Sequence, residues 1–202
     1  MLQLLGSGAS PFVRKTRVLL AEAGLDDVIY VEVAASPMGG EDRVNSANPL
    51  GKIPSLVRDD GPTIYDSNVI CRFLDHHAGG HFYPEARLWE VLTLEATADG
   101  IMEAALSIVY EKRFRPPELW WPDWHAAQWT KVERALDAIE RNWLSHLEGP
   151  VHMGQIAVAC ALGYLDLRFP DRNWRSGRPG LATWEAGFAA RPSMTATAPP
   201  AS

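Results

Sequence analysis

Apolar and polar residues over the first 77 positions alternate between strand-like and helix-like patterns. The apolar run 2–5 predicts a short strand, and apolar residues then recur every three or four positions until Gly24, where we expect a helix to end. A second apolar run, 28–33, predicts another strand after a short connection. This order is typical of a parallel β-α-β unit with a right-handed crossover. The predicted helical face consists of Phe12, Thr16, Leu19, Leu20 and Ala23.

The segment 34–53 carries loop signals, and two β-prone runs follow it. "PSLV" at 54–57 and "TIY" at 63–65 flank Asp59-Asp60-Gly61, which predicts an antiparallel hairpin. Asp66 or Ser67 is then expected to cap a helix that ends at Gly79-Gly80. The apolar face of that helix consists of Val69, Ile70, Phe73 and Leu74.

The pattern changes near residue 80, because only helical periodicities follow. They cover about 87–112, 124–146, 155–168 and 179–190. We therefore expect an α/β domain over 1–78, a linker over 79–86 and an all-helical domain over 87–190. Residues 191–202 are small, proline-rich and uncharged after Arg191, so we expect a loosely attached tail there.

Composition indicates an ordinary folded protein. The 202 residues are 47% hydrophobic and 22% charged, and the formal net charge of -6 argues against a general nucleic-acid binder. No apolar run approaches the roughly 20 residues of a membrane span, and the N-terminus lacks the pattern of a secretory signal. We expect a cytoplasmic protein with no nucleic-acid or membrane partner.

Cysteine and histidine usage does not favour a metal site. Cys71 and Cys160 are far apart and form no CxxC, so we expect two buried thiols. His76, His77 and His81 are separated by Gly79-Gly80, which interrupts the helical spacing that would align them. We expect no metal.

The stretch "GASPFVRKTRV", residues 8–18, combines a helix start with an excess of positive charge. Ser10 followed by Pro11 is a favoured N-terminal capping pair, and capping alone explains both residues. Three cations, Arg14, Lys15 and Arg17, also lie where the helix dipole is already positive, which favours an anion such as a thiolate. No histidine lies in the first 75 residues to activate Ser10, so we interpret its hydroxyl as a donor to another group's sulfur.

Two later segments offer sites for the groups of a small peptide. In "NPLGKIP", residues 48–54, a cis bond before Pro54 would present the backbone N–H and C=O of Ile53 to a peptide-like ligand. Lys52 could meet a carboxylate, or it could simply be solvated. Asp66 would suit an ammonium group, while the free N–H groups of the helix that begins near Ser67 would suit a carboxylate, although capping also explains Ser67.

With these residues the sequence resembles the glutathione S-transferase superfamily, in particular its bacterial serine-type members. The resemblance spans about residues 1–190 and rests on "SPFVRK", "NPLGKIP" and a "DS" at 66–67 that reads "ES" in most relatives, in this order and spacing. It implies an α/β thioredoxin-like N-terminal domain of order βαβ-ββα and an all-α C-terminal helical bundle. It also implies glutathione as co-substrate, a role in detoxification, and a homodimer.

The resemblance assigns each segment a part of glutathione. Ser10 would donate to the sulfur, and Lys52 would neutralise the glycine carboxylate. The backbone of Ile53, ahead of cis-Pro54, would pair with the cysteinyl group, and Asp66-Ser67 would hold the γ-glutamyl end. The helix containing "IAVACALGYLDLR" begins near His152 and Gln155, where relatives have Ser or Thr and Asp, so we expect a weakened or shifted helix start.

The second substrate of such proteins binds in a variable pocket between the domains, and aromatic residues of the helical domain are its candidates here. Flat apolar side chains suit a hydrophobic electrophile, but they could equally pack between helices or at a dimer surface. A protein with this fold could also bind glutathione or another protein with little conjugating activity. A disulfide reductase or lyase is disfavoured because Ser stands where such enzymes need Cys. The candidates are Tyr110, Arg113, Phe114, Trp120 and Trp121, followed by Trp124.

Overall fold

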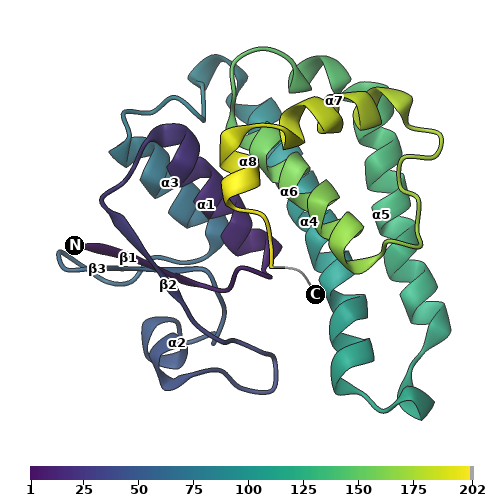
Figure 1. The fold of residues 1–202 in the computed structure, drawn as a ribbon, viewed down its shortest axis with the longest axis horizontal. Coiled ribbons are helices and arrows are strands. Elements are labelled where there is room, and N and C mark those ends of the chain that lie inside the picture. The colour runs from purple at the N-terminus through teal and green to yellow at the C-terminus, as the bar shows by residue number, and fades with distance from the viewer. Residues whose placement is uncertain (201–202) are drawn as a thin grey trace. The chain divides into compact units, whose positions relative to one another are not determined.

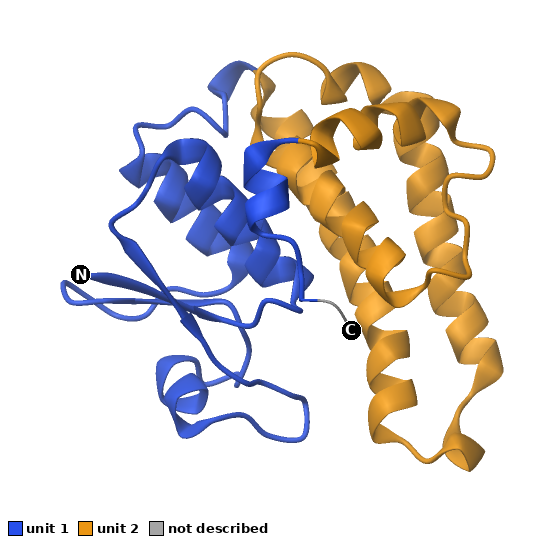
Figure 2. Cartoon of the chain, viewed as in Figure 1, with its two compact units in different colours: residues 1–86, 191–202 blue, residues 87–190 orange. Residues whose placement is uncertain are grey.

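The computed structural model describes residues 1–200, which form two compact units (Figure 2). Unit 1 combines Met1–Ala86 with the chain from Arg191 onward, and unit 2 is Arg87–Ala190. Unit 1 is mixed α/β and unit 2 is helical, so the predicted fold class is confirmed. No helix within residues 1–200 is long and apolar enough to cross a membrane.

Unit 1 is built on a three-stranded sheet in the order β2-β1-β3. Strand β1 (Leu2–Gly6) runs parallel to β2 (Val28–Glu32), with α1 (Pro11–Ala23) connecting them, which confirms the predicted β-α-β unit. Strand β3 (Ser55–Arg58) is antiparallel to β1. Figure 1 shows α1 and α3 (Ser67–His77) on one face of the sheet and α2 (Asp42–Ala47) on the other.

Local signals explain where α1 and α3 begin and end. Ser10 caps α1, Pro11 occupies its first turn, and Gly24 ends it with φ 65°, a left-handed conformation that glycine adopts without steric cost. Asp66 caps α3 by accepting the Asn68 N–H at 3.1 Å. Both caps satisfy backbone donors that a helix start leaves without intrahelical partners.

Two predictions for residues 34–65 need correction. The expected loop contains α2, whose Val44 packs with Leu5 and Val33 in a hydrophobic cluster under the sheet. The expected hairpin is reduced to a single antiparallel bridge between Leu56 and Ile64. Proline at position 62 has no N–H to extend that ladder, and its carbonyl instead accepts the side-chain Nε–H of Arg58 at 2.9 Å.

Residues 191–200 do not form a loosely attached tail. They contain α8 (Pro192–Ala196), which packs on α1 within unit 1. Arg191 donates two hydrogen bonds to the Glu22 carboxylate at 2.8 and 2.7 Å, and Arg14 donates to the Met194 carbonyl at 3.1 Å. Arg191 therefore anchors the segment, and the uncharged residues that follow it did not indicate this. Residues 201–202, the end of the predicted tail, lie outside the described residues.

Unit 2 contains four main helices and no strand among the described residues, as predicted for this part of the chain. Helix α6 is buried along most of its length and packs closely on α4, where Gly154 approaches the Leu94 side chain. The short 3₁₀ turns η1 (Glu85–Arg87), η2 (Pro117–Leu119) and η3 (Leu144–Leu147) lie before and between the long helices. The four helices are α4 (Leu88–Phe114), α5 (Pro122–Asn142), α6 (Met153–Arg168) and α7 (Pro179–Ala189).

The start of α6 is not shifted, because the helix begins at Met153 directly after His152. The Gln155 side chain accepts the His152 N–H at 2.8 Å and donates to the Leu147 carbonyl at 2.7 Å. Gln155 therefore supports the helix start even though histidine is a poor capping residue. Burial lowers the pKa of His152, whose Nε2 lies 2.8 Å from the His146 carbonyl oxygen.

Candidate functional site

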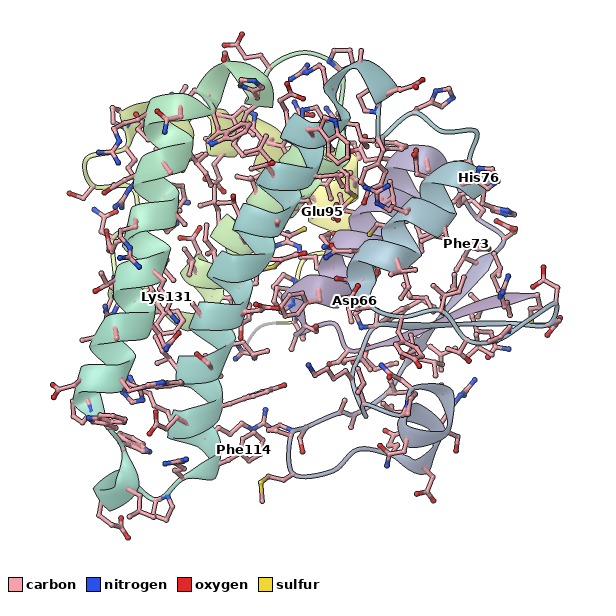
Figure 3. The ribbon with its side chains drawn as sticks, turned by 180° about the vertical axis from the view of Figure 1, so that it is seen from behind. Asp66, Phe73, His76, Glu95, Phe114 and Lys131 are labelled. Atoms are coloured by element: carbon pink, nitrogen blue, oxygen red, sulfur yellow. The ribbon has the colours of Figure 1, made fainter. Side chains whose placement is uncertain are left out.

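The sheet register of unit 1 brings three predicted site segments to one edge. Leu5 pairs with Ser55, so the chain that leaves β1 toward Ser10 and the Ile53-Pro54 segment that enters β3 meet there. The Leu56–Ile64 bridge then directs residues 65–67 back to the same edge. Figure 3 shows Asp66 at the beginning of α3. Ser10, Ile53-Pro54 and Asp66-Ser67 are therefore neighbours by topology, although they are far apart in sequence.

Ser10 keeps a proton to donate. Its Oγ accepts the Val13 N–H at 3.4 Å, and its own N–H donates to the Ser7 carbonyl at 2.9 Å. Capping uses a lone pair of the hydroxyl oxygen and leaves the O–H free to point at an anion. The side chain is half-buried, at the N-terminal end of α1, where the partial positive charge of the helix also favours an anion.

The 48–54 segment presents the backbone of Ile53. The Ile53–Pro54 peptide bond is cis, as the resemblance implies. The Lys52 carbonyl accepts the Asn48 amide at 2.9 Å and the Ser55 hydroxyl at 3.1 Å, which holds the segment in place. Within residues 1–200, the N–H and C=O of Ile53 have no hydrogen-bond partner, and the Lys52 side chain is exposed. These groups are available to an extended peptide and to a carboxylate.

The beginning of α3 combines an exposed carboxylate with a buried hydroxyl. Asp66 is exposed and uses one oxygen for its cap, whereas the Ser67 side chain is buried in the first helical turn. Lys15 donates to the Asn68 side chain at 2.6 Å, which connects the start of α1 to the start of α3. An ammonium group at Asp66 and a carboxylate at the helix start would be well accommodated here.

The cations of α1 also contact groups of the protein itself. Arg14 donates to the Met194 carbonyl, and Lys15 donates to Asn68. The Arg17 guanidinium lies 4.4 Å from the centre of the Tyr30 ring.

Glu32 supports the turn before Ser10, a role that no sequence pattern indicated. Both carboxylate oxygens of Glu32 accept the Gly8 N–H, at 3.1 and 3.2 Å, and the hydroxyls of Tyr30 and Ser7 donate to it as well. Burial alone would raise the pKa of Glu32, but these hydrogen bonds hold it below the ordinary value. Burial and the bond to Glu32 raise the pKa of Tyr30. Only the parallel pairing of Gly6 with Glu32 places this side chain beside the turn.

The aromatic candidates of unit 2 gather around the C-terminal end of α4, but with different environments. Tyr110 and Phe114 are in edge contact with ring centroids 5.6 Å apart, and the Arg113 guanidinium lies 5.3 Å from the Phe114 ring centre. Trp120 donates its ring N–H to the Arg115 carbonyl at 3.0 Å, so it secures the turn after α4. Trp121 directly precedes α5, makes no side-chain capping bond there, and is 61% exposed. Figure 3 shows Phe114 near the end of α4.

Two residues of α6 that sequence reasoning missed extend this aromatic group. Tyr164 is buried, which raises its pKa to about 12, and it is close enough to interact electrostatically with Tyr110. The Arg168 guanidinium lies 5.9 Å from the Tyr164 ring centre. Burial likewise raises the pKa of Tyr110. Both phenols therefore stay protonated near neutral pH and can donate hydrogen bonds.

Comparison with known proteins identifies the family. Residues 9–77 match the family model of the glutathione S-transferase N-terminal domain, and residues 122–187 match that of the C-terminal domain. The uncharacterized GST-like protein YibF of Escherichia coli (strain K12) is 34% identical over 98% of this chain and 99% of its own. The chain belongs to the glutathione S-transferase family.

Solved structures of other glutathione S-transferases agree with this assignment. A glutathione transferase family member from Pseudomonas fluorescens Pf-5, with bound glutathione, is 44% identical, with a TM-score of 0.96 over 99% of this chain and 100% of its own. A structure from the same organism with bound S-(propanoic acid)-glutathione is 43% identical, with a TM-score of 0.90 and the same coverage. The resemblance drawn from the sequence is confirmed at the level of family and fold.

Two further observations describe this glutathione S-transferase. Cys71 and Cys160 are both buried and form no disulfide, as predicted. Over residues 1–200, no group of three or more His, Cys, Asp or Glu side chains is arranged to hold a metal ion.

Proposed function

We propose that the protein is a glutathione transferase: unit 1 binds glutathione, the Ser10 hydroxyl stabilises its thiolate, and the sulfur attacks a hydrophobic electrophile. The observation that carries this proposal is the gathering of Ser10, Ile53-Pro54 and Asp66-Ser67 at one sheet edge. Lys52, beside Ile53, completes the set with an exposed cation.

Each group in this set matches a part of glutathione. The unpaired backbone of Ile53 suits the cysteinyl peptide, and Lys52 suits the glycine carboxylate. Asp66 suits the γ-glutamyl ammonium, and Ser67 with the start of α3 suits the adjacent carboxylate. A peptide anchored at both ends in this way would hold its sulfur in the middle of the edge, where Ser10 lies.

Thiolate stabilisation requires only a modest change in free energy. An ordinary thiol has a pKa of about 8.5, so only a few per cent is ionised at pH 7. A helix end and a hydroxyl donor that together lower the pKa by about two units would contribute about 2.7 kcal/mol and make the thiolate the major form. The thiolate then forms a C–S bond, while the leaving group departs with the bonding electron pair, or the electrons move onto the acceptor in an addition.

We propose that the aromatic group of unit 2 binds the electrophile. Tyr110, Phe114 and Arg113 supply flat apolar surface with one cation, and Trp120 and Trp121 lie at the following turn. The relative that binds S-(propanoic acid)-glutathione supports a site that accepts a substituent on the sulfur.

The protein is also proposed to be a homodimer, and light scattering that gives the 22.3 kDa monomer mass at micromolar concentration would contradict this.

The test combines binding with turnover. Calorimetry should detect glutathione binding, and steady-state assays with aryl halides, epoxides and organic peroxides should find at least one substrate. Ser10→Ala should reduce kcat/KM on that substrate, whereas Ser36→Ala should not, because the Ser36 hydroxyl bonds within its own turn, where it donates to the Gly39 carbonyl and accepts the Met38 N–H. Glutathione binding without turnover of any electrophile would instead support a binding module, and absence of binding would refute the proposal.

A further inference from the structure

We propose that Glu32 is a positioning residue for the reaction: it fixes the Ser7–Gly8 turn and thereby sets where the Ser10 hydroxyl meets the glutathione sulfur. This inference rests on the proposed function, because it assumes that Ser10 donates to a thiolate. Glu32 itself would touch neither glutathione nor the electrophile. It would act entirely through the backbone of the turn.

The position of Glu32 follows from the sheet. Glu32 is the last residue of β2 and pairs with Gly6, the last residue of β1, so its side chain reaches the chain that leaves β1. Its two oxygens receive the Gly8 N–H at 3.1 and 3.2 Å, together with the hydroxyls of Ser7 and Tyr30. One carboxylate thus holds two consecutive residues of the turn.

The turn transmits this restraint to Ser10. The Ser7 carbonyl accepts the Ser10 N–H at 2.9 Å, so fixing Ser7 fixes the backbone of Ser10. The Val13 N–H then orients the Ser10 oxygen from the helix side, at 3.4 Å. Because that second bond is long, the turn is the stronger of the two restraints.

Gly8 is buried, so its N–H depends on Glu32 for an acceptor. A carbon added at Gly8 would lie 3.9 Å from Glu32 Oε2 and 3.9 Å from Arg17 Nη1. It would lie 3.4 Å from the ring of Pro200, in the C-terminal segment of unit 1. Loss of the carboxylate would leave the Gly8 N–H without its acceptor.

The charge on Glu32 is balanced locally, so its role is geometric. The hydroxyls of Tyr30 and Ser7 and the Gly8 N–H all donate to it, and Arg17 is close enough to stabilise the negative charge. These groups hold the pKa of Glu32 below its ordinary value, so the carboxylate stays ionised throughout the range in which a thiol titrates. Its hydrogen bonds therefore persist at the pH where the reaction would run.

The test measures the pKa of protein-bound glutathione from the ultraviolet absorbance of its thiolate, which needs no electrophile. Glu32→Ala should raise this pKa by about one unit, equivalent to a tenfold lower ratio of thiolate to thiol at a given pH, while the Kd for glutathione changes less than about twofold. Tyr30→Phe removes one donor to Glu32 and should produce a smaller shift in the same direction. Asp59→Asn is the matched control, because Asp59 pairs with the N-terminal ammonium at the opposite edge of the sheet.

The outcomes separate this inference from the proposed function. An unchanged thiol pKa in Glu32→Ala, combined with a raised one in Ser10→Ala, would overturn the role of Glu32 and leave that of Ser10 intact. An unchanged pKa in both variants would overturn both roles. If Glu32→Ala does not fold, Tyr30→Phe decides the question, because it removes one donor that holds the Glu32 carboxylate in place and the pKa should still rise. A value equal to that of the unsubstituted protein would then refute the inference.

Discussion

Replacing Ser10 by three different residues separates its structural role from its proposed chemical role. Threonine keeps both the capping oxygen and the hydroxyl proton, glycine keeps most of the capping stability without a hydroxyl, and alanine loses both. Donation to an ionised sulfur is a hydrogen bond to a charged group, worth about 1.5–3 kcal/mol. Removing it should lower kcat/KM by about 10- to 150-fold, equally in Ser10→Gly and Ser10→Ala, while Ser10→Thr retains most of the activity.

Stability should follow a different order in the same three variants. Loss of an N-terminal cap costs about 1 kcal/mol, and the 3.4 Å distance from Val13 N to Ser10 Oγ places this cap at the weak end. Ser10→Ala should therefore lower the Tm by about 1–4 °C, while Ser10→Gly changes it less. Steady-state kinetics and thermal unfolding on the same preparations test the reasoning. If activity follows the Tm, with glycine active and alanine impaired, then Ser10 is a cap only and the chemical role is refuted.

Two further predictions concern the contacts that sequence reasoning misjudged. Gln155→Leu should destabilise unit 2 by about 1–3 kcal/mol, because it leaves the His152 N–H at the α6 cap buried without an acceptor, while the Leu147 carbonyl keeps the Trp184 ring N–H. Gln128→Leu on α5 is its control, and equal Tm values for the two would contradict the assigned role. Arg191→Ala should cost about 1 kcal/mol, since Arg191 is 38% exposed and its pairing is screened by solvent. Hydrogen bonds from Arg191 lower the pKa of Glu22 below 4.5. The destabilisation caused by Arg191→Ala should therefore have its full size above pH 4.5 and become smaller as the pH falls and Glu22 is protonated. A pH-independent loss in denaturant titrations would refute the pairing.

Local signals in the sequence were sufficient for the elements that carry Ser10 and Asp66. The Ser-Pro start and glycine end of α1, and the Asp-Ser start of α3, depend on backbone groups within one or two turns. Such signals predict where a helix begins but not which neighbours meet there. The convergence of the site segments depends on strand register, which only the assembled sheet defines.

Features that depend on distant contacts were not predictable in the same way. Glu32 supports the turn before Ser10 only because β1 and β2 pair in parallel, 24 residues separating Glu32 from Gly8. Arg191 anchors α8 to Glu22 across 169 residues, and an apparently featureless composition gave no sign of it. The contacts of Arg14 and Lys15 could not be predicted for the same reason, because their partners lie in α8 and α3.

The pH titration of protein-bound glutathione tests the central claim most directly. Thiolate absorbance of the complex between the unsubstituted protein and glutathione should show a pKa about two units below the ordinary value of about 8.5, with the thiolate as the major form at pH 7. Ser10→Gly should bring the pKa of the bound thiol most of the way back up to its ordinary value, since it removes the hydroxyl and keeps the helix start. A bound thiol that titrates at its ordinary value in the unsubstituted protein would contradict the account, because the site would then hold glutathione without activating it.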